Sequence, residues 1–539
     1  MPNLLLDLPP ELVVRILCYL HLPDVLSCTR THSSLLALTK DFVVLQYHMA
    51  TQTAMVADNP HCNLPISERF DMLKRREEGW KKFRVDFRKT IPVKHVPSGI
   101  YEMTGGIFLL GDTTRKALHY LTLPSKATDE PSWSRIDIDS TMVDIGLSIY
   151  EHDLVAVVTT TPQQDCDKIE IQLLQFSSGQ PHPLAHTPKI HVADSSWGPR
   201  PAIGIEIVGD HLALITNYFL NAMQPDDDFY VYEWKTGTLK LHITAPNHTY
   251  SSLVFLSPEF ILLPNAYRCS LDIWKIPTTP ETAPKCPLRI LGLPSVGRLI
   301  VRFRCRGEPN PAPYGHSYSS KPFHDSSSNA LVIFTIRTQL LGTAFSMIVH
   351  RRTLLALCAG TPDLEAPRTT QEELIAGVDV LVEYLFAPHV PWSHWGPKNT
   401  RWFSTDSIVT RWITTSAGQR CVISFDDHEA EEEEAEEPQQ QPRRPPSILD
   451  FNPLIVERRL LEDDFGPTES LCMEPSKLDD DSFLEVVESQ LPFARLNLPW
   501  DMEGLEGFEG VMMDDERLLV LKTDESNKIV EIEVIHMGS

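Results

Sequence analysis

The chain of 539 residues is long enough for several domains or for one large repeat domain with an appendage, and its 42% hydrophobic content allows a real core. Its formal net charge of -25 disfavours nucleic acid and anionic membranes as general partners, because like charges repel. The ten cysteines form no CxxC pair, so we expect no zinc site, other metal or cofactor. No signal peptide or membrane-spanning apolar run is evident, which predicts a cytoplasmic or nuclear protein.

The first 50 residues carry three apolar groups at helical spacing. Asp7 can accept hydrogen bonds at a helix start, and Pro9 and Pro10 suit a first helical turn. Three short helices cannot bury this much apolar surface alone. The residues therefore predict either a helical cap on the next domain or an exposed protein-binding face. The three groups are Leu12, Ile16, Leu17 and Leu20; Val25, Leu26 and Cys28; and Leu35, Leu36 and Leu38 with Val44 and Leu45.

The same segment resembles the F-box signature, in Leu8-Pro9-x-Glu11-Leu12 and then Ile16-Leu17-x-x-Leu20-x-Leu22-Pro23-Asp24-Val25-Leu26. Two positions depart from the family pattern, because Leu35 and Leu45 stand where tryptophans are usual. The resemblance implies docking onto a Skp-family adaptor and, through it, onto a cullin. It implies the role of a substrate receptor of an SCF-type ubiquitin ligase, without an enzymatic activity of its own. The residues to which it assigns adaptor contact are Leu8, Pro9, Leu12, Ile16, Leu17, Leu20, Leu22 and Val25.

Residues 66–89 are predicted to form a bridging helix with one apolar face and one charged face. Gly79 weakens the middle of such a helix by ~1 kcal/mol relative to alanine. We expect the helix to pack on the next domain and to fix the F-box rigidly against it. The order of F-box, charged helix with a tryptophan and β-rich region resembles a group of fungal F-box proteins, notably those of basidiomycetes.

From about residue 95, short apolar runs alternate with turn residues such as Lys235-Thr236-Gly237, which is typical of half-buried strands. This spacing favours a degenerate β-propeller of about six or seven blades, with a pair of β-sandwiches as the competing fold. Strands near 518–535 are expected to close the ring with those near 100–120. The predicted α+β multidomain layout is an F-box at 1–50, a bridging linker at 51–92, blades at 93–425, a disordered acidic and proline-rich insert at 426–447, and final propeller strands at 448–539.

Two stretches of the β-rich body have residues suited to binding. Arg298, Arg302, Arg304 and Arg306 share one face of a predicted strand. Such a row could contact an acidic or phosphorylated substrate, although we favour the solvent side of an outer strand. The second stretch carries four tryptophans that could line a pocket, but core packing is the preferred interpretation. They are Trp392, Trp395, Trp402 and Trp412.

No GxSxG, HExxH or P-loop pattern occurs in the sequence. We therefore expect a non-catalytic receptor whose F-box binds the adaptor and whose propeller recruits a protein substrate. Two alternatives stay open: an F-box scaffold that acts outside a ligase, and a propeller enzyme with a helical cap.

Overall fold

The computed structural model describes most of the chain between residues 5 and 538. The predicted insert at 426–447 falls outside the described residues except for its last two positions, and Trp412 falls outside them as well. In the described part of the chain, no helix is long and apolar enough to cross a membrane. The described ranges are 5–163, 166–195, 201–218, 225–339, 344–359, 387–404, 415–423, 446–461, 466, 468–498 and 510–538.

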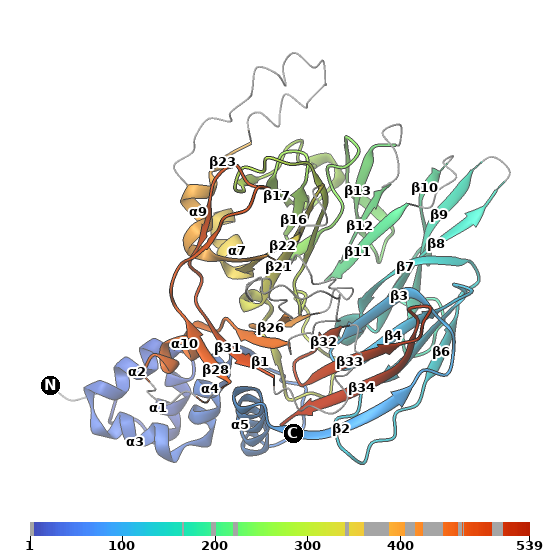
Figure 1. Ribbon diagram of the computed structural model, residues 1–539. Helices are drawn as coiled ribbons and strands as arrows, with labels where there is room; N and C mark the ends of the chain where they lie inside the picture. The colour runs from blue at the N-terminus through green and yellow to red at the C-terminus, as the bar shows by residue number, and fades with distance from the viewer. Residues whose placement is uncertain are drawn as a thin grey trace, which may run out of the picture.

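Seven sheets, mostly antiparallel, form the blades of a β-propeller (Figure 1). The first strands of neighbouring blades contact one another, β3 with β7, β7 with β11 and β11 with β15, so they surround a central channel. The predicted propeller is confirmed, and the β-sandwich alternative is wrong. From the innermost strand outward, the first four blades are β3 (Pro97–Thr104), β4 (Ile107–Asp112), β5 (Ala117–Thr122) and β6 (Ser134–Asp137); β7 (Thr141–Ser148), β8 (Leu154–Pro162), β9 (Asp167–Gln175) and β10 (Lys189–Ser195); β11 (Ala202–Val208), β12 (His211–Asn217), β13 (Asp227–Glu233) and β14 (Thr238–Ala245); and β15 (Val254–Ser257), β16 (Phe260–Asn265), β17 (Ser270–Lys275), β18 (Arg289–Gly292) and β23 (His389–Val390).

The last three blades carry the larger insertions and the ring closure. Blade 5 and blade 6 take strands from separated parts of the chain, and blade 7 takes one strand from before blade 1. From the innermost strand outward, they are β19 (Ile300–Arg306), β21 (Leu331–Thr338), β22 (Ala344–His350) and β24 (Thr400–Ser404); β25 (Ser416–Ala417), β26 (Arg420–Ile423), β27 (Ser447–Asp450), β31 (Phe493–Asn497) and β28 (Glu469–Cys472); and β32 (Val511–Met513), β33 (Arg517–Thr523), β34 (Ile529–Met537) and β2 (Val85–Pro92).

The ring closes in blade 7, where β2 pairs with β34 in an antiparallel register. Closure by strands near 100–120 is therefore a wrong prediction, because those strands form blade 1 with β6. The bridging helix is shorter than predicted, since it ends at Lys82 and Phe83 adopts a left-handed conformation with φ of 48°. The propeller accordingly begins at Val85 and not at residue 93. Val85, Phe87 and Ile91 alternate with exposed residues, as a half-buried strand requires.

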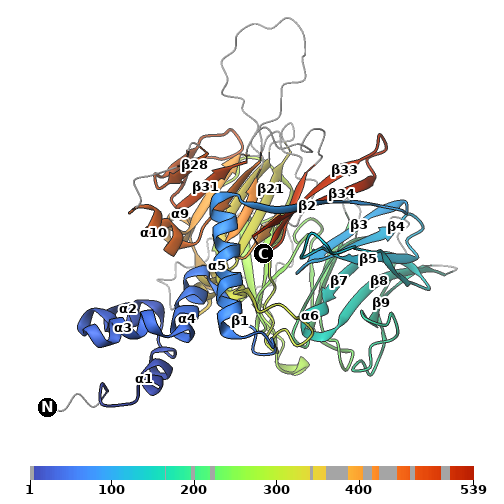
Figure 2. The same cartoon turned by 90° about the horizontal axis from the view of Figure 1, so that it is seen from below.

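Before β2, the chain is mainly helical and lies to one side of the ring (Figures 1 and 2). Four helices form where three were predicted, because Phe42 is extended, with φ of -111°, and divides the third apolar group. Among the described residues, the helices are α1 (Pro10–Leu17), α2 (Leu22–Thr31), α3 (Ser33–Asp41), α4 (Val43–Ala54), α5 (Ile66–Lys82), α6 (Ile149–His152), α7 (Arg351–Ala359), α9 (Trp392–Asn399) and α10 (Pro453–Arg459), with 3₁₀ turns η1 (Pro280–Thr282) and η2 (Ser327–Asn329).

The hydrophobic core lies between neighbouring blades. Val158 of β8, for example, packs in one cluster with Leu212 and Leu214 of β12. Core packing is also confirmed for the described tryptophans of this stretch: Trp395 and Trp402 are almost fully buried, and the half-buried Trp392 packs against the same cluster. The indole nitrogen of Trp395 donates a 2.8 Å hydrogen bond to the Gly292 carbonyl. This aromatic cluster therefore holds α9 against blade 4.

A segment that we call the strap, residues 307–322 between β19 and β20 (Phe323–Asp325), bridges several blades at one end of the channel. The Tyr314 backbone N–H donates to Glu151 of blade 2, at 2.8 Å. Asn310 donates to Glu206 of blade 3, at 2.5 Å, and Lys321 lies 2.7 Å from Asp515 of blade 7. These contacts span the ring, so the strap covers the channel at this end.

Candidate functional site

A small apolar core holds α1, α2, α3 and α4 together as one module. Leu17 of α1 and Val25 of α2 pack there against Leu35 and Leu45. Leu22 is also buried. Leu17, Leu22 and Val25 are therefore core residues and not the surface contacts that were predicted, because the module needs their side chains for its own fold. Leu35 and Leu45 contribute to the same core.

An apolar stripe remains uncovered along α1, and we call it the α1 stripe. It consists of Leu8, Leu12, Ile16 and Tyr19, which are 37%, 47%, 41% and 79% exposed. Leu12 and Ile16 lie one turn apart on α1, whereas Leu8 precedes the helix and Tyr19 follows it. Pro9, which precedes α1, is exposed too. Figure 2 shows α1 at one edge of the module, below α2 and α3 in that view.

Two further apolar side chains are exposed on the neighbouring helices. Leu26 of α2 is 40% exposed and Leu36 of α3 is 43% exposed. The sequence prediction assigned no partner contact to these two or to Tyr19. The helical spacing from Ile16 could have indicated Tyr19, whereas Leu26 and Leu36 required knowledge of which face each helix buries.

The turn between α1 and α2 is held on α4 by Gln52. Its side-chain oxygen accepts a 2.6 Å hydrogen bond from the Leu22 N–H, and its amide nitrogen donates to the Leu20 carbonyl at 3.1 Å. Leu20, a predicted adaptor contact, is consequently half-buried. These bonds fix the direction in which α1 leaves the module.

The module is joined to the strap side of the propeller through a short strand. Strand β1 (Val56–Asp58) pairs with β20, with Ala57 opposite His324. Asp58 accepts a 2.7 Å hydrogen bond from the Tyr47 hydroxyl and lies 2.9 Å from Arg69. One residue therefore connects α4, β1 and α5.

Side-chain amides reinforce this joint. The Asn59 amide nitrogen donates to the carbonyls of Ser319 and Lys321 in the strap, at 3.1 and 2.8 Å. Asn452, which caps α10 in blade 6, donates to the Thr53 carbonyl at 2.8 Å. The module is thus bound at two separate places on the propeller.

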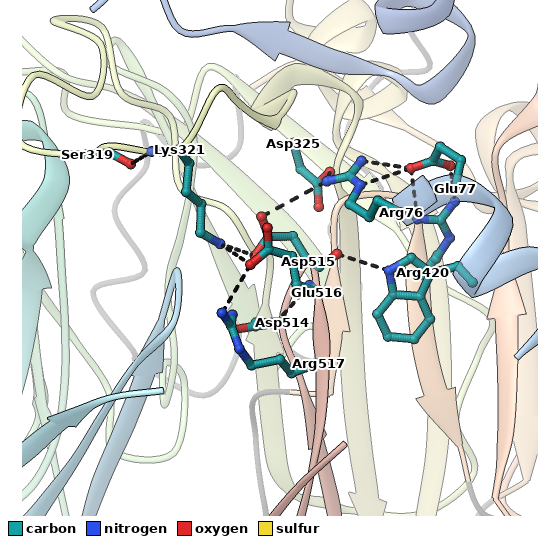
Figure 3. A network of polar contacts seen from close by, with 11 residues as sticks. Arg76, Glu77, Ser319, Lys321, Asp325, Arg420, Asp514, Asp515, Glu516 and Arg517 are labelled. Carbon is teal, nitrogen blue, oxygen red and sulfur yellow. Dashed lines mark hydrogen bonds and ion pairs between the residues drawn. The ribbon is translucent and has the colours of Figure 1, made fainter. Parts of the chain in front are cut away.

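A buried ionic network ties α5 to blades 6 and 7 and to β20 (Figure 3). Arg76, which is 2% exposed, lies 2.8 Å from Glu77 and 3.2 Å from Asp325. Glu77 in turn lies 2.5 Å from Arg420 of β26. The network continues through Asp450, Lys321, Asp514, Asp515, Glu516 and Arg517, and the Trp80 indole donates to the Asp515 carbonyl at 2.9 Å.

The pKa shifts in this network agree with a set of buried ions that depend on one another. Burial alone would lower the pKa of Arg76, but Asp325, Glu77 and Asp515 raise it above its usual value. Burial likewise opposes ionisation of Asp515, yet Lys321 and Arg76 hold the pKa of Asp515 well below its usual range. For Asp325, burial outweighs the attraction of Arg76 and raises the pKa to about 6. Charge pairing therefore keeps α5 in place in a nearly dry environment.

Gly79 lies where α5 meets the C-terminal end of β34. A Cβ added at Gly79 would lie 3.0 Å from the Gly538 nitrogen and 3.1 Å from its Cα. Figures 1 and 2 both place the C terminus beside α5. The glycine that weakens the helix thus allows close backbone contact with the strand that closes the ring.

We expect Gly79→Ala to lower the thermal midpoint of unfolding. Alanine favours a helix by ~1 kcal/mol, but the added methyl would push apart two backbones, at a cost of about 1–3 kcal/mol. The matched control is Gly99→Ala, because nothing lies within 4 Å of a Cβ at that position. Differential scanning calorimetry of both variants checks the prediction. A midpoint for Gly79→Ala at or above that of the wild type would contradict it.

The predicted arginine row is divided by the structure. It lies on β19, which is the innermost strand of blade 5 and not an outer strand as we expected. Arg306 is not available to a partner, because it lies 2.6 Å from Glu102, 2.9 Å from Glu308 and 3.4 Å from Glu206. Arg298 precedes β19 and is exposed, whereas Arg302 and Arg304 lie within the strand.

In the part of the chain that the structure describes, no group of three or more histidine, cysteine, aspartate or glutamate side chains is placed to hold a metal ion. The buried carboxylates around Arg306 are already engaged with that cation. The described part therefore offers the module's exposed apolar face as its clearest functional site.

Two solved structures illustrate the fold likeness. The chain is similar to BamB from Moraxella catarrhalis, with 8% identity, 83% of this chain and 98% of that chain covered, and a TM-score of 0.31. It is also similar to the C-terminal WD40 domain of Sif2, with 8% identity, 84% and 99% coverage, and a TM-score of 0.34. Likenesses at this level say nothing about what the chain binds. No protein-family model matches the chain, and no curated protein sequence matches it either.

Proposed function

We propose that this protein is a non-catalytic substrate receptor of an SCF-type ubiquitin ligase, in which the α1–α4 module docks onto a Skp-family adaptor and the propeller recruits a protein substrate. The observation that carries the proposal is the α1 stripe. Three of its residues, Leu8, Leu12 and Ile16, are those to which the F-box resemblance assigns adaptor contact, and all three are exposed.

The stripe has the physical properties of a protein-docking surface. Leu12 and Ile16 lie one helical turn apart, so a partner could bury both with a single groove. An apolar set that stays exposed after a module has built its own core marks an interaction site by default. Leu26 and Leu36 extend the apolar surface to the neighbouring helices.

The joint between module and propeller supports a receptor role. Asn59, the β1–β20 pairing and the Arg76 network all bind the helical part to the blades. A rigid connection would hold a bound substrate at a fixed distance from the adaptor. That distance matters to a ligase, because ubiquitin is transferred by other subunits of the assembly.

The test is direct binding of the full chain to a recombinant Skp-family adaptor, measured by isothermal titration calorimetry. We expect a one-to-one complex. A folded chain that does not bind would overturn the proposal. In a second step, cullin and RING-type subunits are added, and we expect ubiquitin transfer to proteins captured by the chain. Adaptor binding without any cullin-dependent transfer would favour a scaffold that acts outside a ligase.

A further inference from the structure

Three arginines gather on one face of blade 5 beside the central channel. Arg302 and Arg304 are two residues apart on β19 and therefore point to the same side. Arg337 of β21 lies directly opposite Arg302 in the antiparallel register. Arg304 is exposed, and the other two are half-buried. We call these residues the arginine cluster. The sequence prediction missed Arg337, because only the β19–β21 pairing brings it to the row.

Two members of the cluster, Arg304 and Arg337, have little compensating negative charge in the described part of the chain. Arg304 and Arg337 form no ion pair within 4.0 Å among the described residues, whereas Arg306 on the same strand contacts three glutamates. Burial lowers the pKa of Arg302, and the nearby Arg304 and Arg337 lower it further. Like charges that face each other across two strands destabilise a sheet. The cluster is thus a local excess of positive charge that an anion would relieve.

The groups that face Arg304 from other blades do not remove this excess. Although the side chain of Arg304 reaches solvent, the surrounding protein partly desolvates it and lowers its pKa, and Tyr101 of blade 1 and Asp144 of blade 2 oppose this shift only in part. Burial also raises the pKa of Asp144 to about 7, so this carboxyl is only partly ionised at neutral pH. A carboxylate or phosphate brought by a partner would be a stronger counter-ion.

The position of the arginine cluster along the channel decides from which end a partner can approach it. The strap begins immediately after Arg306 and covers that end of the channel. Arg302 lies four residues earlier on β19, roughly 13 Å further along at about 3.3 Å per residue. Leu299 and Val301, at the same end as Arg302, are 61% and 45% exposed. The end of the channel opposite the strap therefore presents cations next to exposed apolar side chains.

We propose that the arginine cluster binds an acidic segment of the recruited protein, with Leu299 and Val301 contacting an apolar residue in that segment. This inference rests on the proposed function, because it names the kind of substrate that the propeller would take. Guanidinium groups suit carboxylate and phosphate oxygens, and extended peptides combine such charge contacts with shallow apolar ones. The whole chain has a net charge of -25 and repels an acidic peptide at long range, so the attraction has to come from this local cluster of cations.

The experiment uses the full chain and a fluorescent peptide of repeated Glu-Glu-Leu units, followed by fluorescence anisotropy. We expect binding that weakens as salt is added, and a loss of at least ~10-fold in affinity for Arg304→Glu/Arg337→Glu. The matched control, Lys116→Glu/Lys275→Glu, makes the same charge change at exposed positions of other blades and should bind as the wild type does. Equal binding by the cluster variant and the wild type would overturn the proposal, as would equal losses in the cluster and control variants.

Two further measurements separate the explanations. Arg337→Gln should weaken peptide binding and at the same time raise the thermal midpoint, because it removes like-charge repulsion from the sheet. A variant that loses both binding and stability would indicate a structural role for Arg337 and count against the proposal. A wild-type chain that binds inorganic tripolyphosphate but not the peptide would overturn it in favour of a small-anion site. Adaptor binding of the cluster variant, measured separately, should stay unchanged. A failure of the peptide-binding proposal is therefore distinguishable from a failure of the receptor proposal.

Discussion

Replacing Arg76 by methionine is expected to lower the free energy of unfolding by about 3–5 kcal/mol, because breaking a buried ion pair is costly and Asp325 loses its cation, whereas Glu77 and Asp515 keep Arg420 and Lys321. Arg76 is 2% exposed and lies near Glu77, Asp325 and Asp515. Methionine fills much of the arginine volume, so lost charge and not a cavity dominates the effect. We expect α5 to loosen on the propeller, and the module with it.

The control for this prediction is Lys74→Met on the same helix. Lys74 lies 2.8 Å from Asp71, but both side chains are more than half exposed, and such pairs contribute about 0–1 kcal/mol. Thermal unfolding and limited proteolysis of the α4–α5 region would be compared between the two variants. Similar small shifts in both would contradict a stabilising role for the buried network.

The destabilisation of Arg76→Met should decrease as the pH falls from 8 to 6. Burial raises the pKa of Asp325 to about 6 even with Arg76 present. The folded-state pKa therefore lies above the unfolded value of about 3.9, and the folded state binds the proton more tightly. Lowering the pH through the folded-state pKa neutralises the buried Asp325 carboxyl and removes part of the free-energy cost of burying its charge. Without Arg76 the pKa of Asp325 rises further, so this carboxyl is neutralised at a higher pH in the variant than in the wild type. The difference in free energy of unfolding between the two proteins should therefore narrow from that higher pH downward.

The sequence predicts the propeller, with a range of six or seven blades that includes the observed seven, because alternating apolar runs are a local signal that each strand carries by itself. The pairing that closes the ring was harder to predict from the sequence. Val85, Phe87 and Ile91 have the alternation of a strand, but they directly follow a helix with the same kind of residues. Their pairing with β34, more than 400 residues away, makes them part of the strand that closes the ring, and no local pattern encodes that pairing.

The module shows where apolar spacing stops being informative. Ile16 and Leu17 are adjacent apolar residues of α1, yet Ile16 is 41% exposed and Leu17 is 1% exposed. The amphipathic pattern says that α1 is helical, but both of its sides carry apolar residues. Which side meets Val25 and Leu45 depends on how α2 and α4 pack.

Long-range ion pairs could not be predicted from the sequence for a related reason. Arg76 was expected on a charged helix face, with no indication that Asp325 and Asp515 would surround it. Arg306 and Arg304 look equivalent in the sequence, and only the positions of blades 1 and 3 separate them, since Glu102 and Glu206 reach Arg306 alone. Such differences between residues of one strand depend on which side chains the closed ring brings next to them, and not on the sequence of the strand itself.

The double variant Leu12→Glu/Ile16→Glu is expected to weaken adaptor binding by at least ~100-fold, or about 2.7 kcal/mol. Each substitution would place an unpaired carboxylate in a contact that the partner otherwise keeps dry, and burying such a charge is costly. The free chain should tolerate the change, because both positions are more than 40% exposed and lie outside the module's core.

The matched control for that variant is Leu239→Glu/Val530→Glu, which changes two comparably exposed apolar residues on propeller strands β14 and β34. Calorimetric titration with the adaptor and a thermal midpoint would be recorded for each protein. Loss of binding with an unchanged midpoint, for the α1 pair alone, is the expected result. Undiminished binding by the α1 variant would sink the idea that this stripe is the docking surface, and a joint loss in both variants would point to a nonspecific charge effect. Because Leu17, Leu22 and Val25 are needed for folding, only exposed positions such as Leu12 and Ile16 can separate docking from stability.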